Sequence, residues 1–568
     1  LPDYMVPSSF ALLQRLPLDA NGKLDRRGLP AADAGAAADA AYIAPRTRAE
    51  RVVADVWAEV LGADRVGAED DFFALGGDSI LSIRVASRLR AELGVEVSPL
   101  AVFSDPTVAS LAAALSAGGS AATGDLPALR PVPRDRPLPV SFAQQRLWFL
   151  DQFEAGSTEY VSAFALRLYG ALDVGALRDA LTTLVARHES LRTTFDSVDG
   201  HGVQVVHPPS AVALPVLDLG GLPRPEREGA LRQALAEEGA RPFDLREGPL
   251  LRVGLVRLAA DEHVLMLSMH HIVTDGWSTG VISDELSAAY AAALEGREPE
   301  LPELDVQYAD FAVWQRELLA TPVLDEQLGY WRRQLAGIAP LELPTDRPRP
   351  AVQTRNGALK RFDLPAHLVG RLRELAQERE ATLFMTLVAA CQLLFARWSG
   401  QDDVAVGTVT SGRDRPGLER LVGMFVNTLV LRSRVDATLP FGEFLASVRE
   451  TVLTAFAHQD VQFERIVDEL QPERDTSRSP LFQAVVALHN LGTTVPDLPG
   501  LRVEEVPLPT VTVSFDLGLD FIADGDGLAA MVEYNTDLFD ASTVDRMAAH
   551  LLALLEAVAA DPDRPVGE

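Results

Sequence analysis

The sequence predicts a multidomain protein in which a small all-α unit precedes a large α/β unit. Two stretches, near residues 31–43 and 117–136, consist of small residues without hydrophobic periodicity. Such segments cannot bury enough apolar surface to offset backbone entropy, so we interpret them as linkers. The segment between the linkers has helical periodicity, whereas the segment after them alternates strand-like and helix-like patterns. A chain of 568 residues also exceeds one typical domain.

The expected small unit spans residues 44–116 and contains two recognisable helices. In the first, apolar residues recur along one face from Val52 to Leu61, with Thr47 at the N-cap position. The second begins near Ser79, after two glycines that permit a tight turn. The N-terminus of a helix has free amide N–H groups and favours an anion, so a phosphodiester on Ser79 would fit there. An ordinary capping serine is the alternative for an isolated G-G-D-S string.

The large unit is expected to mix strands and helices. The patterns predict strands over residues 264–269, 404–410 and 481–488, and helices over residues 280–294 and 383–398. The string V485-V-A-L-H-N resembles L265-M-L-S-M-H-H in texture, although no Asp-Gly follows it. This echo predicts two similar halves, of which only one bears a site.

Composition excludes several classes of protein. The 51 basic and 81 acidic residues give a net charge of −30, which would repel a phosphate backbone and disfavours nucleic acid as a partner. The single cysteine, Cys391, excludes an intramolecular disulfide framework and is typical of a cytoplasmic protein. No apolar run approaches the ~20 residues of a membrane span, so we expect no membrane association. Because the chain begins at Leu1 and not at methionine, we expect it to be part of a longer protein.

Two adjacent histidines follow an apolar strand in the string M269-H-H-I-V-T-D-G-W. On an extended chain their side chains point to opposite faces, so they could not chelate one ion, and no Cys or third His lies at ligand spacing. We therefore expect no metal. The same alternation predicts that one imidazole faces a reaction channel while the other faces inward. A purely structural pair is the alternative for an isolated His-His.

Longer strings resemble known families. D70-D-F-F-A-L-G-G-D-S-I resembles a peptidyl carrier domain of a nonribosomal peptide synthetase, and H270-H-I-V-T-D-G resembles the signature of condensation domains and related acyltransferases of the chloramphenicol acetyltransferase superfamily. Other strings match recurrent condensation-domain motifs in the family's order: S141-F-A-Q-Q-R-L-W-F-L, R187-H-E-S-L-R-T-T-F, Y308-A-D-F-A-V-W-Q, G423-M-F-V-N-T-L, H458-Q-D-V-Q-F-E-R and R478-S-P-L-F-Q.

The head of the chain resembles the C-terminal end of an adenylation domain, through L16-P-L-D-A-N-G-K-L-D-R-R-G-L-P. In that family the lysine of N-G-K, here Lys23, contacts the acyl-adenylate. With only about thirty residues of that domain present, no nucleotide site can form. We therefore expect Lys23 to be a relic.

The resemblance implies a four-helix carrier bundle and an α/β condensation domain of two chloramphenicol-acetyltransferase-like lobes in a V shape. The expected boundaries are an adenylation remnant at 1–30, a linker at 31–43, the carrier at 44–116, a linker at 117–136 and the condensation domain at 137–568, with its N-lobe at about 137–312 and its C-lobe at about 313–568.

The implied function is amide bond formation between two carrier-bound substrates. Ser79 is expected to carry 4′-phosphopantetheine, added by a separate phosphopantetheinyl transferase. The donor would be an acyl or peptidyl thioester on this arm. The acceptor would be an aminoacyl group on a downstream carrier, and an upstream adenylation domain would load Ser79.

The resemblance also implies roles for residues of the histidine motif. His271 would face the channel and either abstract the amine proton or hold the amine by a hydrogen bond, while His270 would be a supporting group. Gly276 is a candidate oxyanion donor through its amide, because a residue without a Cβ lets backbone come close to the reacting carbonyl. We expect Asp275 to form a turn with this glycine.

The remaining expected roles are partner and channel residues. In the family the motif aspartate forms a salt bridge, for which we favour Arg187 over Arg192. Trp277 and Asn427 are candidates for lining the substrate channel, with a packed tryptophan and a capping asparagine as the alternatives.

Other functions stay open at this point. A non-catalytic condensation-like docking module would commonly lose the histidine motif, which this sequence keeps. Epimerisation domains share that motif but differ in others, and a dual epimerising condensation domain would have an additional His-His motif near its start, which Pro137 to Phe149 lacks. The direct carrier-to-condensation order favours an L or achiral donor, although G-G-D-S and F-V-N-T-L-V-L-R are often found where D residues are handled.

Overall fold

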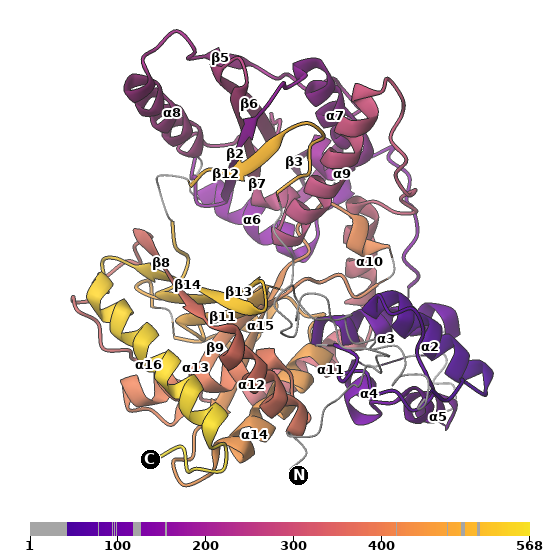
Figure 1. The fold of residues 1–568 in the computed structure, drawn as a ribbon, viewed down its shortest axis with the longest axis vertical. Helices are drawn as coiled ribbons and strands as arrows, with labels where there is room; N and C mark the ends of the chain where they lie inside the picture. The colour runs from indigo at the N-terminus through magenta and orange to yellow at the C-terminus, as the bar shows by residue number, and fades with distance from the viewer. Residues whose placement is uncertain are drawn as a thin grey trace, which may run out of the picture. The chain divides into compact units, whose positions relative to one another are not determined.

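The structure is a computed structural model that describes residues 42–568 apart from 78, 94, 96, 98, 118–126, 154–155, 416, 474, 490–494 and 508–511. The adenylation-like head with Lys23 lies outside the described residues. The chain divides into two compact units, residues 1–122 and 123–568, each described by itself (Figure 1).

The described part of the small unit is all helical. Its helices are α2 (Arg48–Leu61), α3 (Ser79–Leu93), α4 (Pro99–Ser104) and α5 (Val108–Ala117). Thr47 is the N-cap of α2, as predicted, and forms a capping box with Glu50. The indole of Trp57 lies 5.1 Å from the ring of Phe72, and both side chains are fully buried in the core of the unit.

The turn before α3 depends on a glycine. The N–H of Gly77 donates to the carbonyl of Phe72 over 2.9 Å. A Cβ at Gly77 would lie only 2.4 Å from the Phe72 ring, so a side chain there would displace this core aromatic. The helix then begins at Ser79, as predicted.

The N-lobe of the large unit is built on a five-stranded sheet of order β12-β2-β7-β6-β5. Its strands are β2 (Val161–Tyr169), β5 (Val216–Asp218), β6 (Leu251–Ala259), β7 (Glu262–His270) and β12 (Arg502–Glu505). The helices α7 (Val174–Arg187) and α9 (Gly276–Leu294) pack on one face, where Leu177 and Leu286 meet the sheet residue Leu265. The helix α8 (Arg224–Gly239) covers the other face through Leu231 and Leu235.

Smaller elements complete this lobe. A three-stranded sheet has the order β1-β4-β3, formed by β1 (Leu138–Pro139), β3 (Thr193–Val198) and β4 (His201–Val206). The helices α6 (Phe142–Phe153) and α10 (Tyr308–Leu318) and the 3-10 helices Glu189–Arg192 and His271–Val273 lie beside it.

The C-lobe is built on a six-stranded sheet of order β10-β9-β11-β13-β14-β8. Its strands are β8 (Gly357–Leu364), β9 (Asp403–Thr410), β10 (Asn427–Arg434), β11 (Ala484–His489), β13 (Leu517–Asp524) and β14 (Gly527–Asn535). Figure 1 shows α12 (Ala366–Glu378), α13 (Leu383–Ser399) and α16 (Ala541–Ala560) along one side of this sheet. The lobe also contains α11 (Val323–Gln334), α14 (Phe441–Ala457), α15 (Phe463–Leu470) and the 3-10 helix Leu418–Arg420.

A crossing strand joins the two lobes. The strand β12 follows β11 of the C-lobe in sequence but pairs antiparallel with β2 at the edge of the N-lobe sheet, with Val503 opposite Leu168. The N-lobe sheet is therefore completed by chain that lies almost two hundred residues beyond the lobe boundary expected from sequence.

The elements expected from sequence in the large unit are present, with one wrong start. The predicted strands correspond to β7, β9 and β11, and the predicted helix at 383–398 corresponds to α13. The helix expected at 280–294 instead begins at Gly276, because Asp275 caps it. The texture echo relates two strands that each end in histidine, β7 at His270 and β11 at His489.

No single helix of the described residues is long and apolar enough to cross a membrane. The pair α12 and α13, bent by 101° at their junction, meets the requirements of length and composition only when the two are taken together.

Candidate active site

His270 closes strand β7 and is a buried, neutral side chain. It is 5% exposed, and its ring meets the ring of Phe243 edge-on at 6.1 Å. Burial, together with the neighbouring His271, lowers the pKa of His270 to about 3. Its Nδ1 accepts the backbone N–H of Ile272 over 3.1 Å. His270 therefore acts as an acceptor that fixes the turn after the strand.

His271 opens the 3-10 helix His271–Val273 and is partly exposed. The expectation that both histidines lie on extended chain is therefore wrong for His271, because the turn and not strand alternation separates the two rings. Its backbone N–H donates to the carbonyl of Tyr160 over 2.8 Å. Its Nδ1 lies 3.1 Å from the sulfur of Met424.

Asp275 is the N-cap of α9 and the centre of a buried hydrogen-bond network. Its carboxylate accepts the N–H of Ser278 over 2.9 Å, the hydroxyl of Ser278 over 2.7 Å and the N–H of Phe425 over 2.9 Å. Arg413 donates to both carboxylate oxygens, over 2.8 and 3.0 Å.

The charge state of Asp275 follows from these contacts. Burial alone would raise its pKa, but the charge and hydrogen bonds of Arg413 and the hydrogen bonds of Ser278 outweigh burial, so the pKa lies below its usual value. Asp275 is therefore an ionised, four-sided brace between the loop after β7 and the chain at 413–425.

The salt-bridge partner expected from sequence is wrong. Arg187 donates through Nε to Glu285 on α9 over 2.9 Å, and Nε2 of His188 lies 2.8 Å from the other oxygen of the same carboxylate. Arg192 donates to the carbonyl of His207. The R187-H-E-S-L-R string thus fastens α7 to α9 and does not reach the aspartate of the histidine motif.

Arg413, the true partner, was missed by sequence reasoning. It follows the end of β9 in the string S411-G-R, where a buried strand runs into a glycine and a cation. Gly412 has φ +62°, and a Cβ there would lie 2.1 Å from the carbonyl oxygen of Phe425. A strand end followed by Gly-Arg was the signal available in the sequence.

Several of the recurrent strings meet around the histidine turn. The hydroxyl of Tyr308 donates to the carbonyl of Met424 over 2.6 Å and lies 2.7 Å from the hydroxyl of Ser141. Gln144 donates to the carbonyl of Ile272 over 3.2 Å. A Cβ at Gly423 would lie 2.0 Å from the Tyr308 ring, so this glycine lets the ring pack against the chain. The strings that begin at 141, 308 and 423 therefore build one scaffold.

Gly276 and Trp277 lie at the start of α9. Gly276 is exposed, and a Cβ there would meet no atom within 4 Å. As the first residue of the helix, its N–H has no acceptor within the helix. Trp277 is partly exposed and donates through its indole N–H to the carbonyl of Glu419 over 2.8 Å. The tryptophan therefore ties α9 to the 3-10 helix Leu418–Arg420.

Asn427 is buried, and its amide is fully occupied by backbone groups. It donates to the carbonyls of Gln459 and Val461, both over 2.8 Å, and accepts the N–H groups of Thr428 and Phe463 over 2.8 and 3.1 Å. An asparagine amide has two donor hydrogens and two acceptor positions, so none remains for a substrate. The geometry favours the structural alternative for Asn427, which fixes the H458-Q-D-V-Q-F string.

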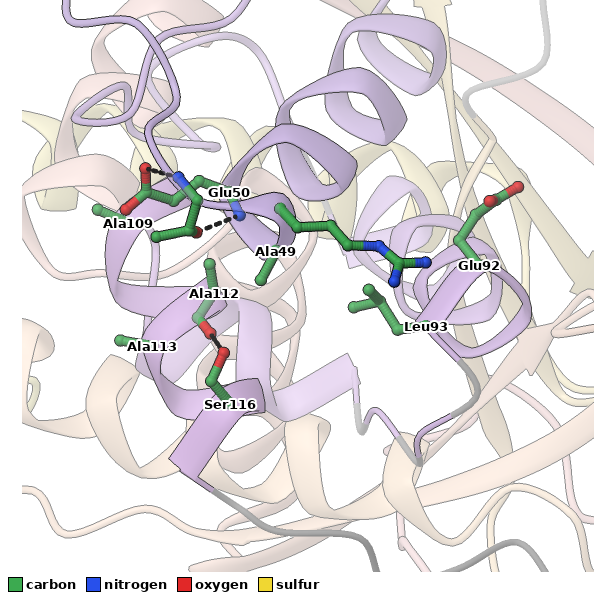
Figure 2. Close-up of a pocket in the computed structure, with 10 residues that line it drawn as sticks. Ala49, Glu50, Glu92, Leu93, Ala109, Ala112, Ala113 and Ser116 are labelled. Atoms are coloured by element: carbon green, nitrogen blue, oxygen red, sulfur yellow. Dashed lines mark hydrogen bonds between the residues drawn. The ribbon is translucent and has the colours of Figure 1, made fainter.

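In the small unit, a cavity of about 600 Å³ lies at the far end of α3 from Ser79 (Figure 2). Figure 2 shows Glu92 and Leu93 of α3 opposite Ala49 and Glu50 of α2 across this cavity. Thirteen residues of helix separate Glu92 from Ser79, or about 20 Å at 1.5 Å per residue. The cavity is therefore not at the residue for which a phosphodiester was predicted.

The described residues contain no group of three or more His, Cys, Asp or Glu side chains that could hold a metal ion.

Two family models match the chain. The condensation domain model matches residues 135–568, and the phosphopantetheine attachment site model matches residues 51–115. One of the proteins of the linear gramicidin synthase of Brevibacillus parabrevis is 48% identical over 570 residues, covering 100% of this chain and 11% of that protein. Surfactin synthase subunit 1 of Bacillus subtilis (strain 168) is 40% identical over 567 residues, covering 100% of this chain and 15% of that protein. The chain thus spans a small part of the length of these relatives.

Solved structures have the fold of the large unit. The X-domain from teicoplanin biosynthesis, at 33% identity and a TM-score of 0.70, covers 78% of this chain and 99% of its own. The first condensation domain of the calcium-dependent antibiotic synthetase, at 21% identity and a TM-score of 0.65, covers 77% of this chain and 99% of its own.

Proposed function

The chain belongs to the condensation-domain family of the nonribosomal peptide synthetases, with a phosphopantetheine attachment domain before the condensation domain, and from this premise we propose how its residues perform the reaction. A condensation domain is an acyltransferase that forms amide bonds. We infer that the donor is an acyl or peptidyl thioester held on Ser79 and that the acceptor is an aminoacyl group on a downstream carrier. The observation that carries this proposal is His271, held at the end of β7 on a loop that the buried Asp275–Arg413 pair braces.

The residues around Ser79 fit an attached phosphopantetheine. Ser79 is the first residue of a helix of 15 residues, whose N-terminal amides favour the phosphodiester. Gly77 allows the tight turn before it, since a side chain there would strike Phe72. The bound arm supplies the thioester whose carbonyl carbon is attacked. Ser79 holds that arm through its hydroxyl oxygen.

His271 handles the proton that the acceptor amine must lose. As the amine nitrogen bonds to the thioester carbon, Nε2 of His271 accepts the amine hydrogen, first through a hydrogen bond and then by proton transfer. The carbon–sulfur bond breaks with its electron pair on sulfur, and His271 returns the proton to that sulfur. One proton leaves nitrogen and one arrives at sulfur, so the exchange of thioester and amine for amide and thiol balances.

Gly276 is proposed to stabilise the oxygen of the attacked carbonyl. Its N–H stands at the N-terminus of α9, where the helix dipole also favours negative charge. The exposed backbone and the open space beside Gly276 would give a carbonyl access to this donor. Trp277, next on the helix, is proposed to border the channel with its partly exposed ring.

We propose an L or achiral donor, because the carrier leads directly into the condensation domain with no epimerisation domain between them. Acceptance of a D donor is the alternative that the G-G-D-S and F-V-N-T-L-V-L-R strings favour. The proposed partners are an upstream adenylation domain, a downstream aminoacyl carrier and a phosphopantetheinyl transferase. A cytoplasmic location accords with the single, buried Cys391.

A second candidate function is partner docking. The X-domain from teicoplanin biosynthesis was solved in complex with OxyB, and it is 33% identical to this chain. The complete H-H-x-x-x-D-G motif and its braced loop favour catalysis here.

The experiment is a reconstituted condensation. Ser79 is loaded from synthetic L- or D-aminoacyl coenzyme A, a separate aminoacyl carrier is added, and the products are identified by mass spectrometry. We expect dipeptide from the L donor and a fall on the order of 10²–10⁴-fold in His271→Ala. Normal turnover in a folded His271→Ala chain would contradict catalysis by this residue, and efficient use of only the D donor would contradict the proposed stereochemistry.

A further inference from the structure

A methionine side chain contacts the ring of His271. Nδ1 of His271 lies 3.1 Å from Sδ of Met424, which the structure brings from a position 153 residues further along the chain. A thioether has no hydrogen to donate and is a weak acceptor. A hydrogen bond between these atoms therefore requires the proton to be on Nδ1 of His271.

Both partners of this contact are held by backbone hydrogen bonds. On the histidine side, the N–H of His271 donates to Tyr160, and Gln144 donates to the next carbonyl, that of Ile272. The methionine carbonyl accepts the hydroxyl of Tyr308, which is fully buried.

The neighbours of Met424 are fixed as well. The N–H of Gly423 donates to the hydroxyl of Ser278 over 3.0 Å, and the N–H of Phe425 donates to Asp275 over 2.9 Å. Asp275 and Ser278 belong to the same loop and helix that follow His271. The network that braces the histidine loop therefore also sets the place of the sulfur.

The position of the proton matters for the proposed chemistry. A neutral imidazole has one N–H and one unprotonated nitrogen. With the proton on Nδ1, Nε2 keeps its lone pair and can accept the hydrogen of an amine. With the proton on Nε2, the ring would present a donor to that amine, and no group on His271 could receive the hydrogen.

We propose that Met424 is a positioning residue that holds His271 in the Nδ1–H tautomer through an N–H···S hydrogen bond. The inference rests on the proposed function of His271 and adds the residue that keeps Nε2 ready. A methionine that only fills space beside the ring is the competing account, since this side chain is also well suited to irregular gaps.

The test begins with the unchanged chain, loaded on Ser79 and labelled with ¹⁵N-histidine. Long-range ¹H–¹⁵N correlations report which ring nitrogen carries the proton, and the signals of His271 among the ten histidines are identified by their loss in His271→Gln. We expect the Nδ1–H pattern at neutral pH. An Nε2–H pattern would overturn the proposal without any variant.

Met424→Leu removes the acceptor at nearly constant volume. We expect a shift of His271 toward the Nε2–H tautomer and a fall in condensation turnover of about three- to tenfold, the range of one hydrogen bond. Met385→Leu makes the same chemical change at a fully buried helix position of the C-lobe and should leave both readouts unchanged. A folded Met424→Leu chain with the wild-type tautomer, or with unaltered turnover, would contradict the role of the sulfur.

The same assay separates this inference from the function on which it rests. If His271→Gln kept full turnover, the catalytic role of His271 would fail whatever the tautomer. If His271→Gln lost turnover and Met424→Leu did not, only the role of Met424 would fail.

Discussion

Arg413 holds Asp275 by two hydrogen bonds to the two carboxylate oxygens, and the side chains are 1% and 2% exposed. The pair connects the chain after β9 of the C-lobe with the N-cap of α9 in the N-lobe. Because both charges are withdrawn from water, removing one leaves the other buried and uncompensated.

The first prediction is that Asp275→Asn and Arg413→Met each destabilise the large unit by about 3–5 kcal/mol and lower condensation activity as well. His271→Ala should instead lower activity and leave the melting temperature unchanged. Chemical denaturation gives the free energy of unfolding, and the reconstituted condensation gives turnover. Full stability in Asp275→Asn with lost turnover would assign the carboxylate a direct chemical role.

A double-mutant cycle identifies the partner. The losses from Asp275→Asn and Arg413→Met should not add, because either change already breaks the pair. Arg187→Met serves as the matched control: Arg187 binds Glu285, so its loss should add to that of Asp275→Asn. Additivity in the first cycle with coupling in the second would restore the partner expected from sequence.

The second prediction concerns acid. An unfolded histidine binds a proton below pH ~6.5, whereas His270 in the folded chain does so only near pH 3. Between these values the unfolded state holds more protons, so stability should fall as the pH is lowered from 6.5 toward 3, by up to about 5 kcal/mol. The stabilisation from Asp275, whose folded pKa is lowered, is instead present above pH ~3.9 and lost as the pH falls through the folded value.

His270→Asn isolates the histidine contribution. Its side-chain oxygen can still accept the N–H of Ile272 but has no proton to bind in this range. The unfolding free energy of this variant should vary less between pH 6.5 and 4 than that of the wild type, while the exposed control His201→Asn should follow the wild type. Parallel curves for His270→Asn and the wild type would contradict a neutral, buried His270.

The third prediction uses two glycines of α9. Neither Gly276 nor Gly280 has an atom within 4 Å of an added Cβ, so both alanine variants should fold with equal or slightly greater stability. Gly276→Ala should lower turnover between about ten- and a hundredfold, because the methyl group would keep a carbonyl from the N–H of residue 276. Gly280→Ala should keep its turnover. Equal turnover in the two variants would remove Gly276 from the reaction.

The fourth prediction concerns cofactor attachment. Incubation with a phosphopantetheinyl transferase and coenzyme A should add one arm to the chain, measured by intact mass. Ser79→Ala should accept none, whereas Ser104→Ala, at an exposed serine of the same unit, should be loaded as the wild type. An arm that still attaches in Ser79→Ala would place the site on another residue.

Local patterns predicted local structure well. The apolar run before His270 predicted β7, and the Gly-Gly turn predicted the start of α3 at Ser79, because both depend on neighbours in sequence. The start of α9 was misplaced because Asp-Gly also suits a turn, and only the tertiary structure makes Asp275 a cap.

Contacts distant in sequence were out of reach. Asp275 and Arg413 are 138 residues apart, and R187-H-E-S-L-R offered arginines that were closer in the chain. Asn427 resembled a channel residue until its four hydrogen bonds to backbone groups were known. Periodicity and motif spacing carry no information about which distant segments meet.

The crossing strand β12 has a practical consequence for recombining synthetases. A cut at residue 312, between the lobes expected from sequence, would remove β12 from the N-lobe and leave the backbone of β2 unpaired at the sheet edge. Unpaired edges invite pairing with other chains and hence aggregation. A hybrid enzyme that exchanges only the first half should therefore be insoluble or poorly folded unless residues 502–505 come from the same parent. Grafts that take the condensation domain whole avoid the problem.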